Sequence, residues 1–264
     1  MMNNRVIDES LLNKVICIAK QAGEHVINRD STKIIEKDGV ANFVTPTDIA
    51  ISDFLSEKLP EVLEGSKIIS EESKHNASFD DGFVWVLDPI DGTNNFIYEL
   101  GLSVISIGLF ADGIPTLGVI YNPYRDEVYS GIRNKGAWWN GKPIKVNNNT
   151  HISQTMVMLE TGSCNPRDEN ATFAPLKEIF KDCIDYRVSG CSAMDICYVA
   201  SGKVSAFFSE LISIWDYAAA LTILYEAGGK ATRWDGSPLD HSKPGNILVT
   251  NSLLHDEMLH RINN

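Results

Sequence analysis

Cysteine is scarce in this chain and is not arranged for cross-linking or for zinc. The 264 residues contain five cysteines, an odd number, and no two of them form a Cys-x-x-Cys pair. Disulfide frameworks and structural zinc sites both depend on such pairing or spacing. We therefore predict reduced thiols, as in an intracellular protein.

Long apolar runs are missing as well. No run approaches the roughly 18 consecutive apolar residues of a transmembrane helix. Residues 1–10 are polar and lack the apolar centre of a signal peptide. We therefore expect a cytoplasmic protein without a membrane partner.

Positive charge is in deficit. The chain has 23 Lys and Arg residues against 35 Asp and Glu residues, a net charge of −12. Such a balance disfavours non-specific binding to nucleic acid. No repeat, low-complexity segment or Ser/Gly-rich linker interrupts the chain. Its length suits one large domain or two closely packed halves.

The most informative stretch that is present runs from Trp85 to Phe96, with the sequence WVLDPIDGTNNF. The apolar run from Phe83 to Leu87 predicts a buried strand. We expect this strand to stop at Pro89, which has no N–H to donate. Asp88 and Asp91 would then lie together on a tight turn at the strand end.

The two residues after this turn add a site for an anion. A helix could begin at Gly92 and Thr93, whose N–H groups would then have no partner within the helix. Two carboxylates next to such N–H groups suit a divalent metal and a phosphate. A lone Asp-x-x-Asp is usually a solvated turn; the full twelve residues are more specific. They resemble the signature of the inositol monophosphatase family, which consists of lithium-sensitive, magnesium-dependent phosphatases.

A second stretch supports the same resemblance. Trp215 and Asp216 open an Ala-rich segment, and Glu-Ala-Gly-Gly follows at 226–229. Propensity alone would make Asp216 a helix cap. Trp-Asp followed by Glu-Ala-Gly-Gly is similar to the second signature of the family, in which the aspartate binds metal.

The pattern of elements predicts two halves, residues 1–150 and residues 151–264, that form one compact unit. The first half should contain a helix over 8–29, a helix ending near Leu59, and an antiparallel sheet with strands at Val104–Leu109, Thr116–Tyr121, Glu127–Ile132 and Ile144–Val146. We interpret residues 135–141 as a tight turn with a structural role. The second half alternates strands at 155–160, 184–188, 204–208 and 247–250 with helices at 171–180, 192–201, 216–227 and 253–262. The resemblance implies an αβαβα layered sandwich, the sugar-phosphatase fold of inositol monophosphatase and fructose-1,6-bisphosphatase, and also implies a homodimer.

The resemblance assigns a metal site and a set of catalytic residues. It implies that two or three Mg²⁺ ions are held by Glu71, Asp88, Asp91, Asp216 and the backbone carbonyl of Ile90. Hydrolysis would use metal-activated water and no phosphoenzyme. The catalytic group would be Glu71 and Thr93, with Asp48 fixing the Thr93 hydroxyl. Lys37 and Glu72 are further candidates close to this group.

Substrate contacts are expected from several segments. The resemblance implies that the phosphate rests on the N–H groups of Gly92 and Thr93. It also implies that Asp91 and Asp216 contact the substrate, with Asp216 near the leaving oxygen. N–H groups of Gly190, Cys191 and Ser192 could also meet substrate oxygens, although Ser192 could equally be a plain helix cap.

The identity of the substrate depends on two residues before the second signature. The family usually has a glutamate there that contacts sugar hydroxyls; Ser209 occupies that position here, and Glu210 follows it. Either Glu210 replaces the glutamate and the substrate is inositol monophosphate, or the contact is lost. The second case favours fructose-1,6-bisphosphate, NADP or 3′-phosphoadenosine 5′-phosphate.

The sequence leaves two alternative functions open. Aspartyl-phosphate phosphatases have Asp-x-Asp-Gly-Thr at a strand end, whereas this chain has one more residue between its acids. A regulatory protein that binds RNA or a transcription complex is the alternative from another class, and the net charge of −12 disfavours it as the sole role.

Overall fold

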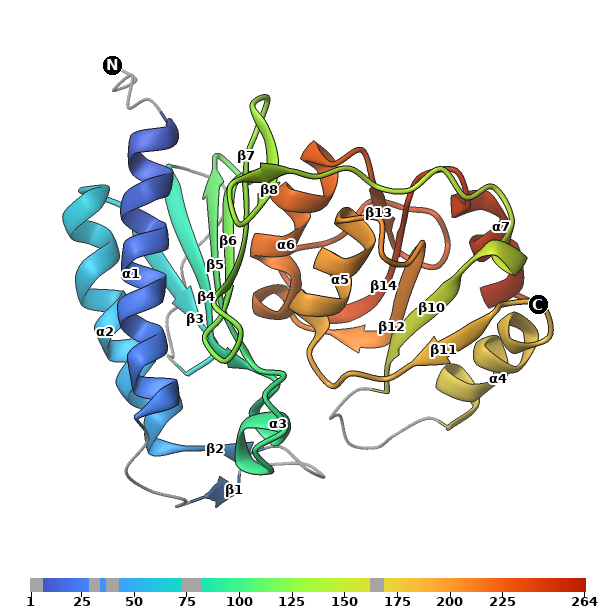
Figure 1. Ribbon diagram of the computed structural model, residues 1–264, viewed down its shortest axis with the longest axis horizontal. Helices are drawn as coiled ribbons and strands as arrows, with labels where there is room; N and C mark the ends of the chain where they lie inside the picture. The colour runs from blue at the N-terminus through green and yellow to red at the C-terminus, as the bar shows by residue number, and fades with distance from the viewer. Residues whose placement is uncertain (1–6, 29–33, 37–42, 73–81, 162–168) are drawn as a thin grey trace.

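The computed structural model describes residues 7–28, 34–36, 43–72, 82–161 and 169–264. Helices and sheets alternate in five layers, αβαβα, as the family resemblance implies (Figure 1). The outer helices on one side are α1 (Glu9–Ile27) and α2 (Pro46–Val62). Between the two sheets lie α5 (Ser192–Ala200) and α6 (Ile214–Glu226). The outer helices on the other side are α4 (Glu169–Phe180) and α7 (His255–Ile262).

The first sheet has seven strands in the order β3-β4-β5-β6-β7-β8-β9, which is also their order in the chain. Every neighbouring pair is antiparallel except β3 and β4, which are parallel. The strands are β3 (Lys67–Ser70), β4 (Phe83–Asp91), β5 (Val104–Ala111), β6 (Ile114–Asn122), β7 (Glu127–Ile132), β8 (Gly136–Trp139) and β9 (Lys142–Pro143).

The second sheet has five strands in the order β11-β10-β12-β14-β13. It is mixed: β10 is parallel to β11 and to β12, while β14 is antiparallel to β12 and to β13. The strands are β10 (Met156–Glu160), β11 (Asp185–Arg187), β12 (Ala206–Ile212), β13 (Lys230–Thr232) and β14 (Gly245–Thr250). The minor elements are β1 (Ile35–Glu36), β2 (Phe43–Val44), α3 (Thr93–Ile97) and the short 3₁₀ helix Ile152–Gln154.

Three predictions about the first half were wrong. Gly136–Trp139 form β8, where a tight turn over residues 135–141 was predicted. Residues 144–146 are not a strand, because they leave the sheet: the Val146 N–H donates to the carbonyl of Ala227, at the end of α6. The strand that was expected to stop at Pro89 continues to Asp91. Its pairing with β5 shifts between Asp88 and Asp91, and this irregularity accommodates the missing N–H of the proline.

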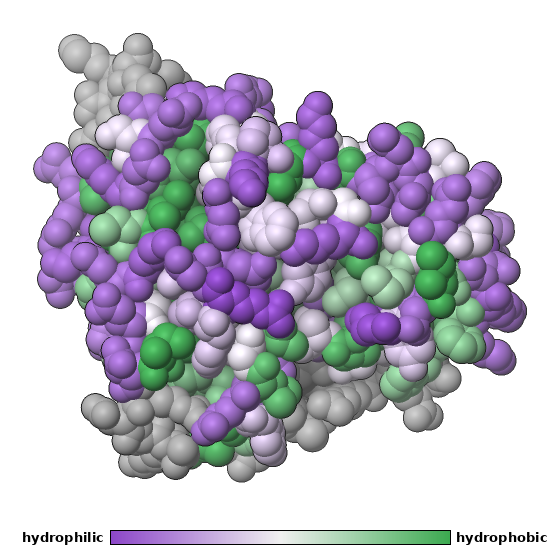
Figure 2. Space-filling model, viewed as in Figure 1, coloured by the Kyte–Doolittle hydropathy of each residue, from purple (hydrophilic) through white to green (hydrophobic). Residues whose placement is uncertain are grey.

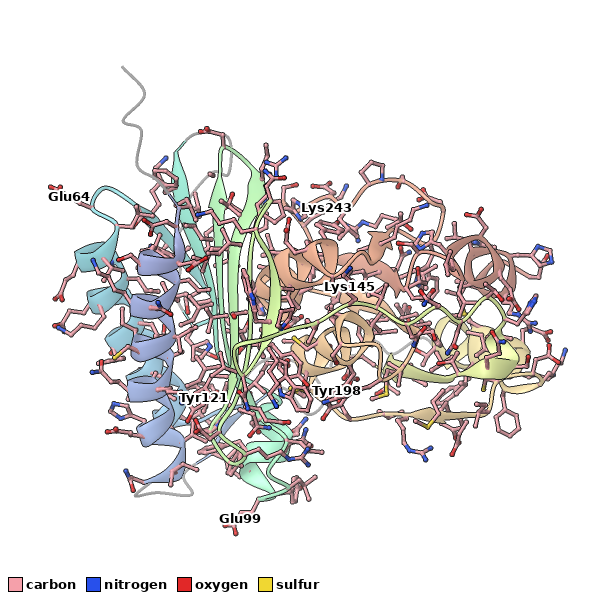
Figure 3. All side chains as sticks on the ribbon, turned by 45° about the horizontal axis from the view of Figure 1, so that its top comes forward. Glu64, Glu99, Tyr121, Lys145, Tyr198 and Lys243 are labelled. Atoms are coloured by element: carbon pink, nitrogen blue, oxygen red, sulfur yellow. The ribbon has the colours of Figure 1, made fainter. Side chains whose placement is uncertain are left out.

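Three apolar cores separate the layers. One lies between α1, α2 and the first sheet, the second surrounds α5 and α6, and the third lies beneath α4 and α7. Figure 3 shows Tyr121 beside α1 and Tyr198 in the middle of the molecule, each packed on a different core. The face seen in Figure 2 is mainly hydrophilic, with apolar side chains in separate patches. Among the helices of the described ranges, none is long and apolar enough to cross a bilayer.

A row of glycines brings α6 close to the first sheet. Gly118 pairs with Gly108 on one neighbouring strand and with Gly131 on the other. A Cβ atom on Gly118 would lie only 2.0 Å from the carbonyl oxygen of Ala219, so no side chain fits there. This close approach holds α6 against the first sheet, and so helps to place Asp216 relative to β4.

Candidate metal and phosphate site

The candidate site is a cleft where the carboxyl ends of β4 and β10 meet the amino ends of α5 and α6. Ligands of α/β proteins commonly bind at such strand ends. Fourteen residues line the cleft: Phe43, Glu71, Asp88, Ile90, Asp91, Gly92, Thr93, Asn94, Glu160, Gly190, Ser192, Leu211, Ile212 and Asp216.

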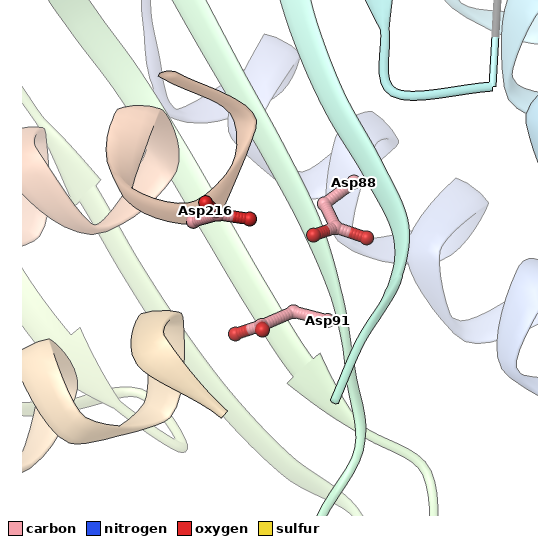
Figure 4. A group of neighbouring side chains, drawn as sticks. All are labelled: Asp88, Asp91 and Asp216. Atoms are coloured by element: carbon pink, nitrogen blue, oxygen red, sulfur yellow. The ribbon is translucent and has the colours of Figure 1, made fainter. Parts of the chain in front are cut away.

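Three aspartates from two distant segments meet in this cleft. Each of Asp88, Asp91 and Asp216 contributes a carboxylate oxygen, and these oxygens lie within 4.8 Å of one another. Figure 4 shows Asp88 and Asp91 extending from β4 towards Asp216 at the start of α6. Glu71 lines the same cleft, and its N–H donates to the carbonyl of Leu87, next to Asp88.

Burial and mutual repulsion make the acids of this cluster hard to ionise in the absence of a cation. The pKa of Asp88 is raised well above its ordinary value, first by burial and then by the charges of Glu71, Asp91 and Asp216. Burial also raises the pKa of Asp91 to about 7. Hard carboxylate oxygens in this number suit Mg²⁺ or another divalent cation, whose charge would remove the repulsion. The donor set therefore fits a metal.

Local hydrogen bonds set the orientation of each aspartate. The Ile90 N–H donates to Asp88 at 3.0 Å. Asp216 is the third residue of α6 and accepts from the Ser213 N–H at 2.8 Å, in a capping box. The sequence predicted Asp216 at the start of the helix, and the helix begins two residues earlier, at Ile214.

Asp91 is held by the amino end of α5. Its Oδ2 accepts a 2.7 Å hydrogen bond from the Ala193 N–H, and the Cys191 thiol donates to the same oxygen at 3.2 Å. Burial raises the pKa of the Cys191 thiol well above its ordinary range, so this cysteine is unsuited to act as a thiolate nucleophile.

The Asp48 carboxylate contacts the Thr93 hydroxyl. It closes the capping box of α2 by accepting from both the N–H and the hydroxyl of Thr45. The Thr93 hydroxyl lies 3.1 Å from the Ile90 carbonyl and 3.5 Å from Asp48 Oδ1, so either oxygen can accept its hydrogen bond. Burial raises the pKa of Asp48 to about 6.

Two glycines and one asparagine form the part of the cleft beside Thr93. Gly92 has φ of 87°, and a Cβ atom there would lie 3.0 Å from the carbonyl oxygen of Gly190. The Asn95 side chain donates to the carbonyls of Ser189 and Gly190. The loop before α5 is thereby tied to α3, with the backbones of Gly92 and Gly190 in close contact.

Some predicted residues lie away from the cleft. Ser209 is buried and donates to the carbonyl of Leu211, while Glu210 accepts from Thr172 of α4 at 3.2 Å; neither lines the cleft. Glu72 does not line it either, although its charge raises the pKa of Asp48. Lys37 lies outside the described residues.

The sequence interpretation did not include Glu160, which lines the cleft from the end of β10. The available signal was an apolar strand that ends in a carboxylate, as the strands before Glu71 and Asp88 do. From the sequence, Asn95 was recognised only as part of the first signature and was given no role of its own. Its three contacts with backbone carbonyls depend on the fold and leave no local pattern.

Comparison with known proteins agrees with the geometry. The model of the inositol monophosphatase family matches residues 4–264. Inositol monophosphatase 3 of Solanum lycopersicum is 34% identical over 97% of this chain and 97% of its own length. The Nus factor SuhB of Haemophilus influenzae is 30% identical over 96% of this chain and 95% of its own length.

The solved structures give the same result at the level of the fold. Inositol monophosphate bound SaIMPase-II superimposes with a TM-score of 0.81 and 30% identity, over 95% of this chain and 92% of that one. A second structure of the same protein contains 2′AMP. Proteins of this family are phosphoric monoester hydrolases, and this one is such a hydrolase: the chain belongs to the inositol monophosphatase family.

Proposed function

We propose that this protein is a Mg²⁺-dependent phosphatase that hydrolyses inositol monophosphate to inositol and phosphate. The observation that carries the proposal is the cluster of Asp88, Asp91 and Asp216, whose carboxylate oxygens lie within 4.8 Å of one another. The cluster opens into the same cleft as Gly92 and Thr93. A metal site and a phosphate site would thus share one cleft, as phosphoryl transfer requires.

Two or three Mg²⁺ ions are assigned to Glu71, Asp88, Asp91, Asp216 and the carbonyl of Ile90. When bound, they would supply positive charge that offsets the charge of the phosphate group and lowers the pKa of water. Hydrogen bonds already orient two of the residues that we propose as metal ligands. The Ala193 N–H and the Cys191 thiol hold Asp91, and the Ser213 N–H holds Asp216.

The chain's own groups would position the attacking water. Thr93 lines the cleft, and its hydroxyl donates to Ile90 or to Asp48. A hydroxyl that donates its own hydrogen bond elsewhere can accept a hydrogen bond from water in the cleft and so orient that water. Glu71, on the same wall as Asp88, would take up one proton from the water as its oxygen attacks phosphorus. The phosphate would rest against Gly92, Thr93, Gly190 and Ser192.

Inositol monophosphate is preferred because a 30% identical relative of the same fold, SaIMPase-II, has been solved with it bound. The same chemistry on fructose-1,6-bisphosphate, NADP or 3′-phosphoadenosine 5′-phosphate is the alternative, and the 2′AMP complex of that relative favours including nucleotides. Phosphate release from this panel, with Mg²⁺ and without it, tests the proposal. A higher kcat/KM for any other compound would replace inositol monophosphate as the substrate.

Family membership also supports three secondary proposals. We expect inhibition by millimolar Li⁺, a homodimer and a cytoplasmic location. Light scattering that gives the monomer mass of 29.2 kDa would contradict the dimer.

A regulatory role in a transcription complex is a second candidate, supported by the 30% identity to a Nus factor SuhB. An acidic chain would have to bind such a complex through protein partners or a local basic surface. Pull-down of transcription proteins by an Asp88→Asn variant that lacks turnover would separate this role from catalysis.

A further inference from the structure

We propose that Glu160 is the residue that recognises the hydroxyl groups of the substrate's leaving alcohol. The inference rests on the proposed phosphatase function and adds a specificity determinant to it. Glu160 is the last residue of β10 and lines the cleft that also contains Asp91 and Asp216.

Strand pairing in the second sheet places Glu160 at the edge of the sheet that borders the cleft. β10 and β12 are parallel, and Glu160, the last residue of β10, lies beside Ser209 of β12. Ser209 is the position where the sequence lacks the expected glutamate. The neighbouring strand, β10, therefore provides the Glu160 carboxylate directly beside the position of Ser209.

The other carboxylate that could serve, Glu210, lies on the wrong face of β12. Successive side chains of a strand point to opposite faces. Phe207 packs on the core around α5 and α6, while Phe208 packs beneath α4 and α7. Glu210 shares the face of Phe208, and its carboxylate accepts from Thr172 of α4. Glu160 lines the cleft and Glu210 does not.

The surroundings of Glu160 suit a ring with hydroxyl groups. Leu211 and Ile212 line the cleft from the same sheet and offer apolar surface to the C–H groups of a ring. The Thr161 N–H donates to Glu160 Oε1 at 3.1 Å and orients the carboxylate. An ionised carboxylate has about four acceptor sites, so it can accept hydroxyl protons in addition to this bond.

Glu160 also lies on a definite side of the metal cluster. Its charge contributes to raising the pKa of Asp91 and of Asp216. Glu160 therefore lies close to these two aspartates. Glu71 is on the wall of the first sheet and Glu160 on the wall of the second.

The test compares two substrates in a Glu160→Gln variant. Myo-inositol 1-phosphate has ring hydroxyls, whereas p-nitrophenyl phosphate has none. We expect kcat/KM for the inositol ester to fall by about tenfold or more, mainly through KM, because a hydrogen bond to a charged group is lost. Turnover of p-nitrophenyl phosphate should change by less than about twofold. Glu61→Gln, at an exposed glutamate of α2, is the matched control and should affect neither substrate.

Three outcomes would overturn the inference. Equal losses on both substrates would mean that Glu160 acts on the metal or the fold. Unchanged kinetics would mean no contact. A selective loss in Glu210→Gln but not in Glu160→Gln would assign the role to Glu210.

A binding measurement separates this inference from the proposed function. Calorimetry with myo-inositol 1-phosphate and Ca²⁺ reports binding without turnover. If the wild-type protein binds the ester but releases no phosphate from it in the presence of Mg²⁺, the proposed function fails. A tenfold weaker affinity in Glu160→Gln would then still support the contact, and an unchanged affinity would overturn it.

Discussion

The carboxylate of Asp91 accepts a hydrogen bond from the backbone N–H of Ala193, 102 residues further along the chain, at 2.7 Å. Asp91 ends a strand of the first sheet, and Ala193 lies in the first turn of α5, beside the second sheet. A helix amino end stabilises a negative charge. The bond therefore fixes a candidate metal ligand and joins the two walls of the cleft at one atom.

Asp88→Asn should abolish phosphatase activity while the fold is retained. Asparagine has the shape of aspartate but lacks the charge, so we expect a loss of at least about a hundredfold in kcat/KM. Burial and then repulsion raise the pKa of Asp88, and relief of both should leave the metal-free melting temperature unchanged or higher. Circular dichroism checks the fold, and Asp53→Asn, at an exposed position of α2, is the control. A variant with near wild-type turnover would contradict the assignment.

Mg²⁺ binding should release protons near neutral pH. In the absence of metal, burial raises the pKa of Asp91 to about 7, so this carboxyl is largely protonated below that pH. A cation displaces the proton. Titration calorimetry at pH 6.5, in two buffers of different ionisation enthalpy, should therefore detect net proton release, and less of it at pH 8.5. No proton release at pH 6.5 would contradict a role for Asp91 as a ligand.

The same shift determines how stability depends on pH without metal. The pKa of Asp91 is raised above its unfolded value, so the stability it contributes is present below about pH 4 and is lost as pH rises through about 7. Mg²⁺ should remove this loss. The increase in melting temperature caused by Mg²⁺ should thus be larger at pH 8 than at pH 5.5.

Gly118→Ala should destabilise the protein. The added methyl group would meet the Ala219 carbonyl at 2.0 Å, so α6 must move away from the sheet. Overpacking of this kind costs about 1–3 kcal/mol in the free energy of unfolding. Because the contact is with backbone, Ala219→Gly should not rescue the variant. Denaturant unfolding measures both effects, and a wild-type midpoint in Gly118→Ala would contradict the close approach.

His255 should make stability fall in acid. The ring is buried between the hydroxyls of Thr232 and Thr250, and burial lowers its pKa to about 4. Because the unfolded state binds the proton more readily, this contribution is complete above about pH 6.5 and is lost as pH falls towards 4. Melting temperatures should change less between pH 7 and pH 5 in His255→Gln than in the wild type. His260→Gln, at an exposed position of α7, should behave as the wild type.

The site residues that could be predicted from the sequence are those that lie in short local motifs. Asp88 and Asp91 lie in one signature, Asp216 lies in another, and the αβαβα fold follows from the order of elements and the family resemblance. These predictions of fold and family are confirmed. The roles of the individual site residues stay predictions.

The remaining features depend on contacts between distant segments. Glu160 lies in no recognisable motif, and its position in the cleft depends on the pairing of β10 with β12. The row of Gly108, Gly118 and Gly131 is formed by strand pairing, and each glycine alone resembles an ordinary weak strand position. The strand through Pro89 was missed because an irregular pairing can accommodate a proline that a regular ladder would exclude.

The central claim, that the aspartate cluster makes this protein a metal-dependent phosphatase of inositol monophosphate, is tested most directly by phosphate release. Protein treated with a chelator and dialysed should release no phosphate from myo-inositol 1-phosphate, and millimolar Mg²⁺ should restore turnover in the wild type but not in Asp88→Asn. Full turnover of the chelated protein, or no release with Mg²⁺ present, would contradict the account.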